Sequence, residues 1–482
     1  MALTSKRRKE MTYKLSLAKK KEIITAKKDF WQFCLYMDFE FFNKRAEVLK
    51  PVAKAMQRVE ERELRLLYVG LPPRTGKSYI TTLFSAWSLG KHPEESIMRN
   101  TVTGDLYSKF SEDLKDIMQG QSHNQKYLNV FPEINFKTEK VKGWKLESTK
   151  QGISYFGAGV GGSIIGFGAS LVAILDDSIK NKEEALSDTM LEKKWGWYTS
   201  THRSRVETGT PEIHIATRWS KKDIPGRLMQ QDMFKSDDAK KIVVPALIDG
   251  KSYCPAAHTT EELLEEKKLN DEIIWEAEWQ QSPVEAKGTL MSKEQLKSFQ
   301  KEQLAQDPDA IIAYIDIADE GDDYLSCPIA YKFGKELYIV DVVFTQSKVE
   351  QSEPQVANAL LQYDVDLAMF ESNNGGKQFA RNVIKLLKQH SGNTTVKWRA
   401  TTSNKETRII MQSGYIKEYF YFRTNYNLGS EYDQFMKQLT SWSKSGGNKH
   451  DDANDSVTGM AELIKGIDSR NKSNRGIDAD IL

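Results

Sequence analysis

The stretch Leu66-Leu-Tyr-Val-Gly-Leu-Pro-Pro-Arg-Thr-Gly-Lys-Ser78 places a glycine-containing loop directly after a short apolar run, and residues 79–89 then have the pattern of a helix. A loop between a strand and a helix is the setting in which backbone N–H groups bind phosphate. The spacing departs from the standard motif because Leu71 stands where glycine is expected, and the nearest glycine is Gly70. The stretch still predicts a nucleotide-phosphate site within an α/β fold.

The residues of this loop have distinct expected roles. Lys77 is expected to neutralise oxygens of the β- and γ-phosphates, and Ser78 to ligate Mg²⁺. Arg74 is a candidate for a phosphate contact within the same chain, while Thr75 and Gly76 supply backbone to the loop. The expected ligands are therefore ATP and Mg²⁺.

A second apolar run, residues 171–175, ends in the paired carboxylates Asp176 and Asp177. A Mg²⁺-coordinating acid must stand at a strand tip that faces the phosphate loop, so Asp176 is the expected ligand. Asp177 is expected to orient the attacking water, with Glu183 or Glu184 as alternatives because aspartate reaches less far. The other interpretation is an ordinary turn that begins with aspartate.

A third strand, residues 213–216, is followed by Thr217, which is placed to sense the γ-phosphate. The alternative is a β-branched residue that merely finishes a strand. Three arginines are candidates for stabilising the site of a neighbouring subunit, and the sequence does not rank them: Arg203, Arg205 and Arg218.

The second half of the chain offers a different chemistry. Asp316 lies in the expected strand 311–317, and Glu371 follows the expected strand 366–370. Three more acids lie at the start of a helix: Asp451, Asp452 and Asp455. Acids from two strands and a helix can converge on two Mg²⁺ or Mn²⁺ ions, which is the arrangement used for phosphodiester hydrolysis. The alternative is that these acids are ordinary caps.

The order of apolar and amphipathic segments predicts how the 482 residues are divided into domains. Strands alternate with amphipathic helices in both halves, which indicates α/β domains, the first with a parallel-rich central sheet. The expected parts are a first domain with a basic N-terminal segment (1–245), a connector (246–298), a second domain (299–465) and a loose tail (466–482).

Charge and cysteine usage narrow the class of protein. The net charge is only +2, but residues 1–30 contain ten Lys and Arg against three acids. This segment is either a frayed solvated terminus or a contact to phosphates or an acidic partner. The three cysteines are far apart and are expected to be free thiols. No apolar run is long enough to span a membrane.

Taken together, these motifs resemble those of the large terminase subunit of tailed bacteriophages. The resemblance rests on the following stretches in this order: Pro72-Pro-Arg-Thr-Gly-Lys-Ser78, Gly161-Gly-Ser163, Leu175-Asp-Asp177, Ile179-Lys-Asn-Lys-Glu-Glu184, Thr217-Arg-Trp219 with Gly226-Arg227, Trp279-Gln-Gln281, Asp316, Glu371 and His450-Asp-Asp-Ala453. They cover most of the chain.

The resemblance implies a motor that hydrolyses ATP to move double-stranded DNA into a procapsid, joined to an RNase H-like endonuclease that cuts concatemeric DNA. By position it implies ATP and Mg²⁺ binding by Lys77, Ser78 and Asp176, catalysis by Asp177 and coupling by Thr217. It places Asp316, Glu371 and Asp451/Asp452 on the nuclease metals, with Asp455 secondary. The implied partners are DNA, portal protein, a small terminase subunit and copies of the chain in a ring, in the host cytoplasm.

Two positions depart from the family pattern. Thr75 stands where relatives often have His, and the catalytic carboxylate is Asp where many members have Glu. Two other functions remain open at this point. One is a helicase or recombination ATPase fused to a junction nuclease, and the other is a DNA and portal adaptor with a degenerate nuclease.

Overall fold

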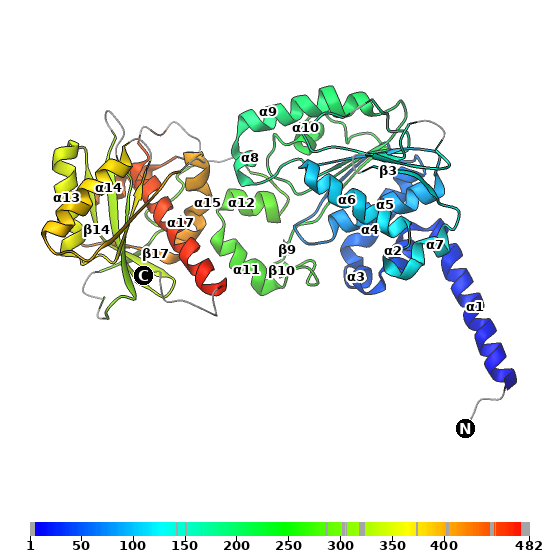
Figure 1. The fold of residues 1–482 in the computed structure, drawn as a ribbon, viewed down its shortest axis with the longest axis horizontal. Coiled ribbons are helices and arrows are strands. Elements are labelled where there is room, and N and C mark those ends of the chain that lie inside the picture. The colour runs from blue at the N-terminus through cyan, green and yellow to red at the C-terminus, as the bar shows by residue number, and fades with distance from the viewer. Residues whose placement is uncertain are drawn as a thin grey trace. The chain divides into compact units, whose positions relative to one another are not determined.

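A computed structural model shows two compact units, residues 1–264 with 273–284 and residues 265–272 with 285–482 (Figure 1). The structure describes residues 5–140, 143–149, 152–164, 166–284, 288–300, 304, 306–317, 323–372, 375–401, 404–443, 448 and 450–473. The domain boundaries suggested by the sequence, including a connector at 246–298, stay a proposal.

The first unit is built on a parallel-rich sheet, with eight strands among the described residues. Their spatial order is β3 (Phe136–Lys140), β4 (Gly143–Leu146), β5 (Tyr155–Phe156), β2 (Ile97–Thr101), β6 (Val172–Asp176), β7 (Glu212–Ala216), β1 (Leu66–Gly70) and β8 (Ala239–Val243). All neighbours from β5 to β8 pair in parallel, which brings the carboxyl ends of β1, β6 and β7 to one edge.

Helices and short strands complete the first unit, and α1 projects from it (Figure 1). They are α1 (Ser5–Lys28), α2 (Phe30–Met37), α3 (Phe39–Lys44), α4 (Ala46–Glu60), α5 (Lys77–Lys91), α6 (Gly104–Met118), α7 (Lys126–Val130), α8 (Lys182–Leu186), α9 (Asp188–Trp197), α10 (Ile224–Gln230), β9 (Leu247–Ile248), β10 (Lys251–Ser252) and α12 (Glu272–Ile274). Apolar side chains of α2, α4 and α5 pack with those of the central strands into one core.

The second unit has a mixed sheet, with seven strands in its described part. Their order is β11 (Lys297–Phe299), β17 (Phe420–Arg423), β14 (Glu336–Thr345), β13 (Leu325–Phe333), β12 (Ala310–Ile315), β15 (Leu367–Glu371) and β16 (Thr395–Arg399). The neighbours β14, β13 and β12 are antiparallel, whereas β15 and β16 run parallel to β12.

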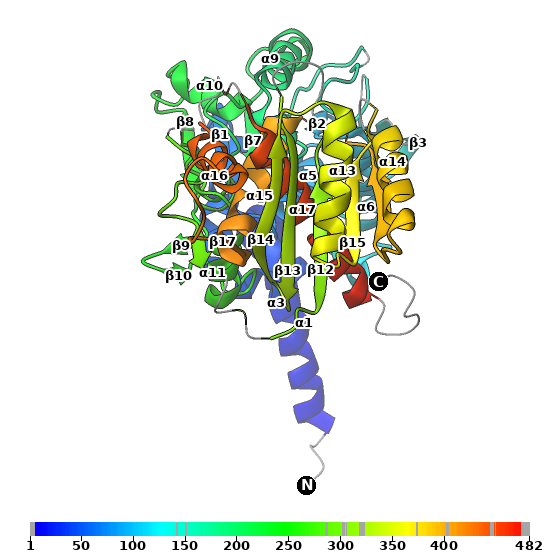
Figure 2. The same cartoon turned by 90° about the vertical axis from the view of Figure 1, so that its left-hand side faces the viewer.

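Helices cover both faces of this second sheet, and Figure 2 shows α13 and α14 lying side by side on one of them. The helices are α13 (Val349–Gln362), α14 (Gly376–Gln389), α15 (Lys405–Tyr419), α16 (Glu431–Ser441) and α17 (Asp452–Ser473), while α11 (Thr260–Leu269) crosses the boundary between the units. Helix α17 lies close against β12, where a side chain at Gly459 would come within 2.2 Å of the Tyr314 ring.

The α/β class and the parallel-rich sheet that the sequence predicted are confirmed. Some element ends differ. Helix α5 spans Lys77–Lys91 and so extends beyond the expected residues 79–89 at both ends. Helix α17 continues to Ser473, so the expected loose tail is helical up to that residue, and residues 474–482 lie outside the described part.

Two further findings bear on the sequence analysis. Cys34, Cys254 and Cys327 are buried free thiols, as expected. Among the described residues, no helix combines the length and apolar character needed to cross a bilayer.

Candidate functional site

The loop that the sequence predicts to bind phosphate runs from the end of β1 to the first residue of α5, so its expected position between a strand and a helix is confirmed. Gly76 caps the helix at φ +109°, and a side chain there would meet the Phe41 ring at 2.9 Å. Glycine therefore satisfies both the backbone conformation and the close approach of α3. Arg74 is exposed, with φ +60°. Thr75 is buried, and its hydroxyl donates to Pro72 O at 2.8 Å.

Lys77 lies at the centre of this site. Its side chain is buried, and Nζ donates to Leu71 O at 2.9 Å and to the hydroxyl of Thr217. Thr217 follows β7, the parallel neighbour of β1, which explains why two residues so far apart in sequence meet here. The structure thus brings the expected phosphate-binding amine and the expected sensor into direct contact.

Asp177 joins the same group. It adopts φ +51° directly after β6, and its Oδ1 accepts a hydrogen bond from Thr217 N at 2.9 Å. The alternative Glu184 is engaged elsewhere, with Lys194 Nζ at 2.9 Å and Lys180 N at 2.7 Å. Glu183 lies beside it in α8. Of the three candidate carboxylates, Asp177 is therefore the one hydrogen-bonded to Thr217.

Asp176 has a partner that sequence reasoning missed. Arg99 of β2 is fully buried, and its Nε donates to Asp176 Oδ2 at 3.1 Å while a second nitrogen contacts the same oxygen. Arg99 also donates to Thr82 Oγ1 at 2.8 Å and to Ser78 O at 3.3 Å. One guanidinium thus connects the acidic strand tip to the first turns of α5. Burial raises the pKa of the Asp176 carboxyl, and Asp177 adds to the rise.

Arg99→Met should destabilise the first unit by about 3–5 kcal/mol, because it leaves Asp176 buried without a partner. The measurement is the free energy of unfolding from denaturant titration at neutral pH. The double variant Arg99→Met/Asp176→Asn should regain most of the loss, since neither member of this buried pair is then charged. Arg58→Met is the control: its pair with Glu63 is 42% and 54% exposed, so about 1 kcal/mol or less is expected. Equal losses for Arg99→Met and Arg58→Met would contradict the prediction.

The arginines proposed to act on a neighbouring subunit differ in availability. Arg218 is buried and pairs with Asp223 at 3.1 Å, so its guanidinium is held within its own unit. Its backbone N–H donates to Gln281 Oε1 at 2.9 Å, which ties the end of β7 to the segment after the π-helix Trp275–Trp279. Arg203 pairs with Glu212. Arg205 is half-buried.

The second unit brings three of the predicted acids together. Asp316 follows β12 and Glu371 ends β15, which are parallel neighbours with Ile315 opposite Phe370. Asp455 reaches them from the first turn of α17. One carboxylate oxygen from each residue lies within 4.8 Å of the others. The arrangement of two strands and a helix expected from the sequence is therefore present, although Asp316 lies just beyond its strand.

Asp452 and Asp451 occupy adjacent positions. Asp452 groups with Asp323 and His450, again with ligand atoms within 4.8 Å of one another, and its Oδ2 accepts from Gln438 Nε2 at 3.2 Å. Asp451 pairs with Lys405 at 2.7 Å. Asp455, secondary by resemblance, thus joins Asp316 and Glu371, while Asp452 belongs to a neighbouring cluster.

Cations and burial set the electrostatics of this centre. Asp455 contacts Arg408 at 3.1 Å and Lys405 at 3.3 Å, yet burial raises its pKa to about 6, with Glu371 contributing. Burial, Asp455 and Glu371 raise the pKa of Asp316 well above its usual range. Carboxylate oxygens are the hard donors that Mg²⁺ and Mn²⁺ prefer, and a cation would offset the repulsion among these clustered charges, so the donor set fits a divalent cation.

The pH dependence of stability should reveal this centre. Because the pKa of Asp455 is raised to about 6 in the folded state, the folded protein binds more protons between about pH 4 and 6. Its stability should therefore fall as pH rises through this range. Mn²⁺ binds the ionised acids, so it should raise the thermal midpoint more at pH 7 than at pH 5, by several degrees at saturation.

The matched variant for this measurement is Asp455→Asn. It removes the titrating group while keeping the side-chain shape. The shifts in thermal midpoint that Mn²⁺ causes at pH 5 and at pH 7 should therefore differ less than in the unaltered protein. Midpoint shifts with Mn²⁺ that are equal at pH 5 and pH 7 in the unaltered protein would contradict the prediction.

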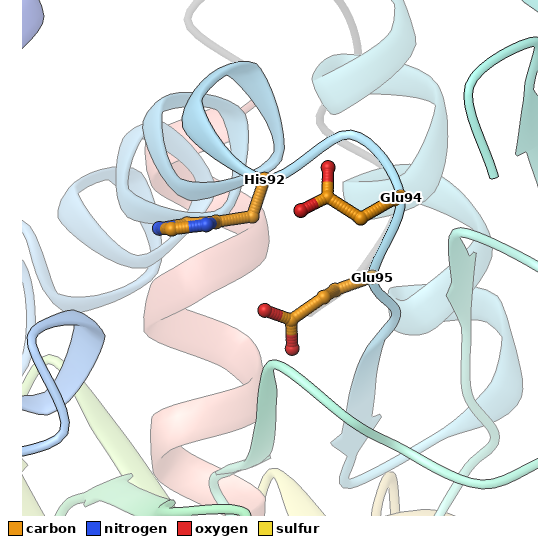
Figure 3. A group of neighbouring side chains, drawn as sticks. All are labelled: His92, Glu94 and Glu95. Carbon is orange, nitrogen blue, oxygen red and sulfur yellow. The ribbon is translucent and has the colours of Figure 1, made fainter.

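A third group of possible ligands lies in the turn after α5, where His92, Glu94 and Glu95 converge (Figure 3). Two of them already have partners. His92 Nε2 lies 2.6 Å from Glu60 Oε1, and Glu95 pairs with Arg62 at 2.7 Å. Interactions within the protein therefore already engage His92 and Glu95.

Known proteins share both sequence and fold features with the chain. The family model described as Terminase Bacteriophage T7, Ribonuclease H-like domain matches residues 315–414. The large terminase of a thermophilic bacteriophage has a similar fold, with a TM-score of 0.50 and 9% identity over 88% of this chain and 98% of that one. No curated protein matches the chain.

Two other solved structures are less similar. The large terminase of bacteriophage HK97 gives a TM-score of 0.30 at 10% identity over 82% of this chain and 91% of that one. The human cytomegalovirus terminase nuclease domain gives 0.28 at 11% identity over 36% and 94%. Neither score supports an argument about this chain.

The fold and the family model define the class of protein: an α/β domain with a parallel-rich sheet, followed by an RNase H-like domain. Within this class, the resemblance indicated by the motifs is confirmed. The second unit carries a terminase RNase H-like domain, and the chain has the fold of a large terminase subunit.

Proposed function

We propose that the chain is the motor and nuclease subunit of a viral DNA-packaging machine. The observation that carries this proposal is that one chain combines two centres. In the first, Lys77 of the predicted phosphate loop contacts Thr217. In the second, Asp316, Glu371 and Asp455 cluster within a domain that matches the terminase RNase H-like model. The first centre is suited to ATP hydrolysis and the second to cutting DNA.

In the first centre, the loop backbone and Lys77 would hold the phosphates of ATP, while Ser78 and Asp176 would hold Mg²⁺, which would neutralise phosphate charge. Arg99 donates to Oδ2 of Asp176 and so orients this carboxylate. Asp177 orients the attacking water. Because Lys77 Nζ contacts the Thr217 hydroxyl, a phosphate bound at the amine would compete with this contact, and Thr217 would be the residue that senses it.

In the second centre, Asp316, Glu371 and Asp455 would hold Mg²⁺ or Mn²⁺, with Asp451 and Asp452 as adjacent candidates. Divalent ions there would activate the attacking water and stabilise the leaving oxygen of a phosphodiester. Lys405 and Arg408 neutralise part of the carboxylate charge, which keeps the cluster folded. The proposed DNA cleavage therefore depends on a divalent metal.

The proposed partners follow from the same assignment. They are double-stranded DNA, a portal protein, a small terminase subunit and further copies of the chain arranged in a ring on the procapsid. The site of action is the host cytoplasm, at the procapsid vertex.

An assay of movement along DNA separates this proposal from a helicase. With ATP, the purified chain should displace a third strand bound to a duplex while leaving the duplex intact. Separation of the two duplex strands would instead favour the helicase or recombination alternative, and an absence of any ATP-dependent displacement would count against a motor.

A further inference from the structure

The second unit contains a long stretch of sequence without acidic residues. The chain has 67 acids in 482 residues, yet residues 372–405 contain none. The same stretch holds seven cations: Lys377, Arg381, Lys385, Lys388, Lys397, Arg399 and Lys405. Two of these are used inside the unit, since Arg399 pairs with Glu462 and Lys405 with Asp451 and Asp455.

Four of the remaining cations form one stripe on α14. The helix buries Phe379, Ala380, Val383 and Leu387, and its opposite side presents Lys377, Arg381, Lys385 and Lys388. Their spacing of four, four and three residues places them in a row along the helix. All four are exposed, and within the described residues none of them forms an ion pair. We call this set the α14 stripe.

The stripe begins beside the carboxylate centre. Helix α14 starts so close to the end of β15 that a side chain on Gly376 would lie 2.0 Å from Glu371 O. Lys377, the next residue, is therefore the end of the stripe nearest Glu371, one of the three clustered acids. From Lys377 to Lys388 the helix rises by about 16 Å, which matches about five phosphates along one strand of duplex DNA.

We infer that the α14 stripe binds the phosphate backbone of double-stranded DNA and guides it to Asp316, Glu371 and Asp455. The inference rests on the proposed nuclease function and names the surface that holds its substrate. An ordinary solvated helix face usually mixes charges of both signs, whereas this one has a single sign over its whole length. A row of unpaired cations leading to a carboxylate centre is suited to a polyanion whose backbone must be cut there.

The test compares two quadruple variants of the full chain. The stripe variant carries Lys377→Gln, Arg381→Gln, Lys385→Gln and Lys388→Gln. The control carries the same change of charge at four other exposed lysines of the second unit: Lys268→Gln, Lys293→Gln, Lys335→Gln and Lys348→Gln. Binding to a fluorescent duplex is measured by anisotropy with EDTA over a series of NaCl concentrations, after thermal unfolding has shown that both variants fold.

For the stripe variant, the slope of log affinity against log salt should decrease by about 0.9 for each contact, about 3.6 for all four. The control should keep the slope of the unaltered protein. In Mn²⁺-dependent cleavage, the stripe variant should need at least about tenfold more DNA for half-maximal rate, with the maximal rate retained because the carboxylates are intact.

Two outcomes would overturn the inference, and they are distinguishable. If the unaltered protein binds and cuts duplex DNA but the stripe variant matches it in slope and affinity, the surface is wrong and the nuclease function stands. If the unaltered protein neither binds nor cuts duplex DNA, the proposed function and the inference both fail.

Discussion

Lys77→Ala should reduce ATP hydrolysis by at least about 10²–10³-fold, because it removes the positive charge that stabilises the developing charge on the phosphates. The amine is buried at the end of β1 and contacts Leu71 O and Thr217. Alanine at this position can neither donate to the phosphates nor contact Thr217, the residue that follows β7. The measurement is steady-state phosphate release with Mg²⁺, with and without duplex DNA.

The control for this variant is Lys54→Ala, an exposed lysine on α4 of the same unit. It removes an equal charge outside the loop, so hydrolysis should stay unchanged. Mn²⁺-dependent cleavage of DNA by Lys77→Ala should also continue, since the carboxylate centre lies in the other unit. Hydrolysis retained in Lys77→Ala would contradict the assignment of this loop as the catalytic nucleotide site.

Sequence reasoning found the parts of the fold whose pattern is local. The runs that became β1 and β6 are apolar and short, and a fully buried parallel strand needs that composition. Asp176 ends β6 and Asp177 follows it, while Lys77 begins α5 after the loop that follows β1, so all three were found from the carboxyl ends of these strands. The same logic located Asp316 and Glu371 in the second unit.

Strand β2 was missed because its sequence, Ile97-Met-Arg-Asn-Thr101, does not resemble a buried strand. Its polar residues are nevertheless buried, since each has a partner from a distant segment. Arg99 meets Asp176, and Asn100 hydrogen-bonds His202 and Ala158 N. Because these hydrogen-bond partners come from distant segments, the local pattern of apolar and polar residues does not reveal that β2 is buried. A charged residue inside an otherwise apolar segment was the available signal.

The choice between Asp452 and Asp455 shows a similar limit. Both acids lie in the first turn of α17 and both are buried. Helical spacing places them on one side, but contacts with distant segments, such as Gly459 against Tyr314 and the Ser456 hydroxyl against Ser326, set how the helix is turned toward β12. That rotation directs Asp455 toward Asp316 and Glu371, and Asp452 toward His450.

Asp316→Asn should abolish Mn²⁺-dependent cleavage of plasmid DNA, with a loss of about three orders of magnitude, or about 4 kcal/mol of transition-state stabilisation. Asparagine keeps the shape of the side chain but removes the charge needed to hold a divalent ion between β12 and β15. ATP hydrolysis should persist. The control is Asp341→Asn, because Asp341 lies in β14 and bonds Tyr363 at 2.7 Å, away from the three clustered acids. Full cleavage by Asp316→Asn would contradict the nuclease assignment.

The same variant separates a catalytic role from a structural one by the sign of its effect on stability. Burial and the neighbouring carboxylates raise the pKa of Asp316, so its ionised form destabilises the metal-free fold at neutral pH. With EDTA, Asp316→Asn should therefore be as stable as the unaltered protein or more stable, and Mn²⁺ should no longer raise its thermal midpoint. A merely structural aspartate gives the opposite result, because replacing it removes a favourable contact. A charge cluster that weakens the empty fold and gains stability only with a cation is what a metal-dependent nuclease requires.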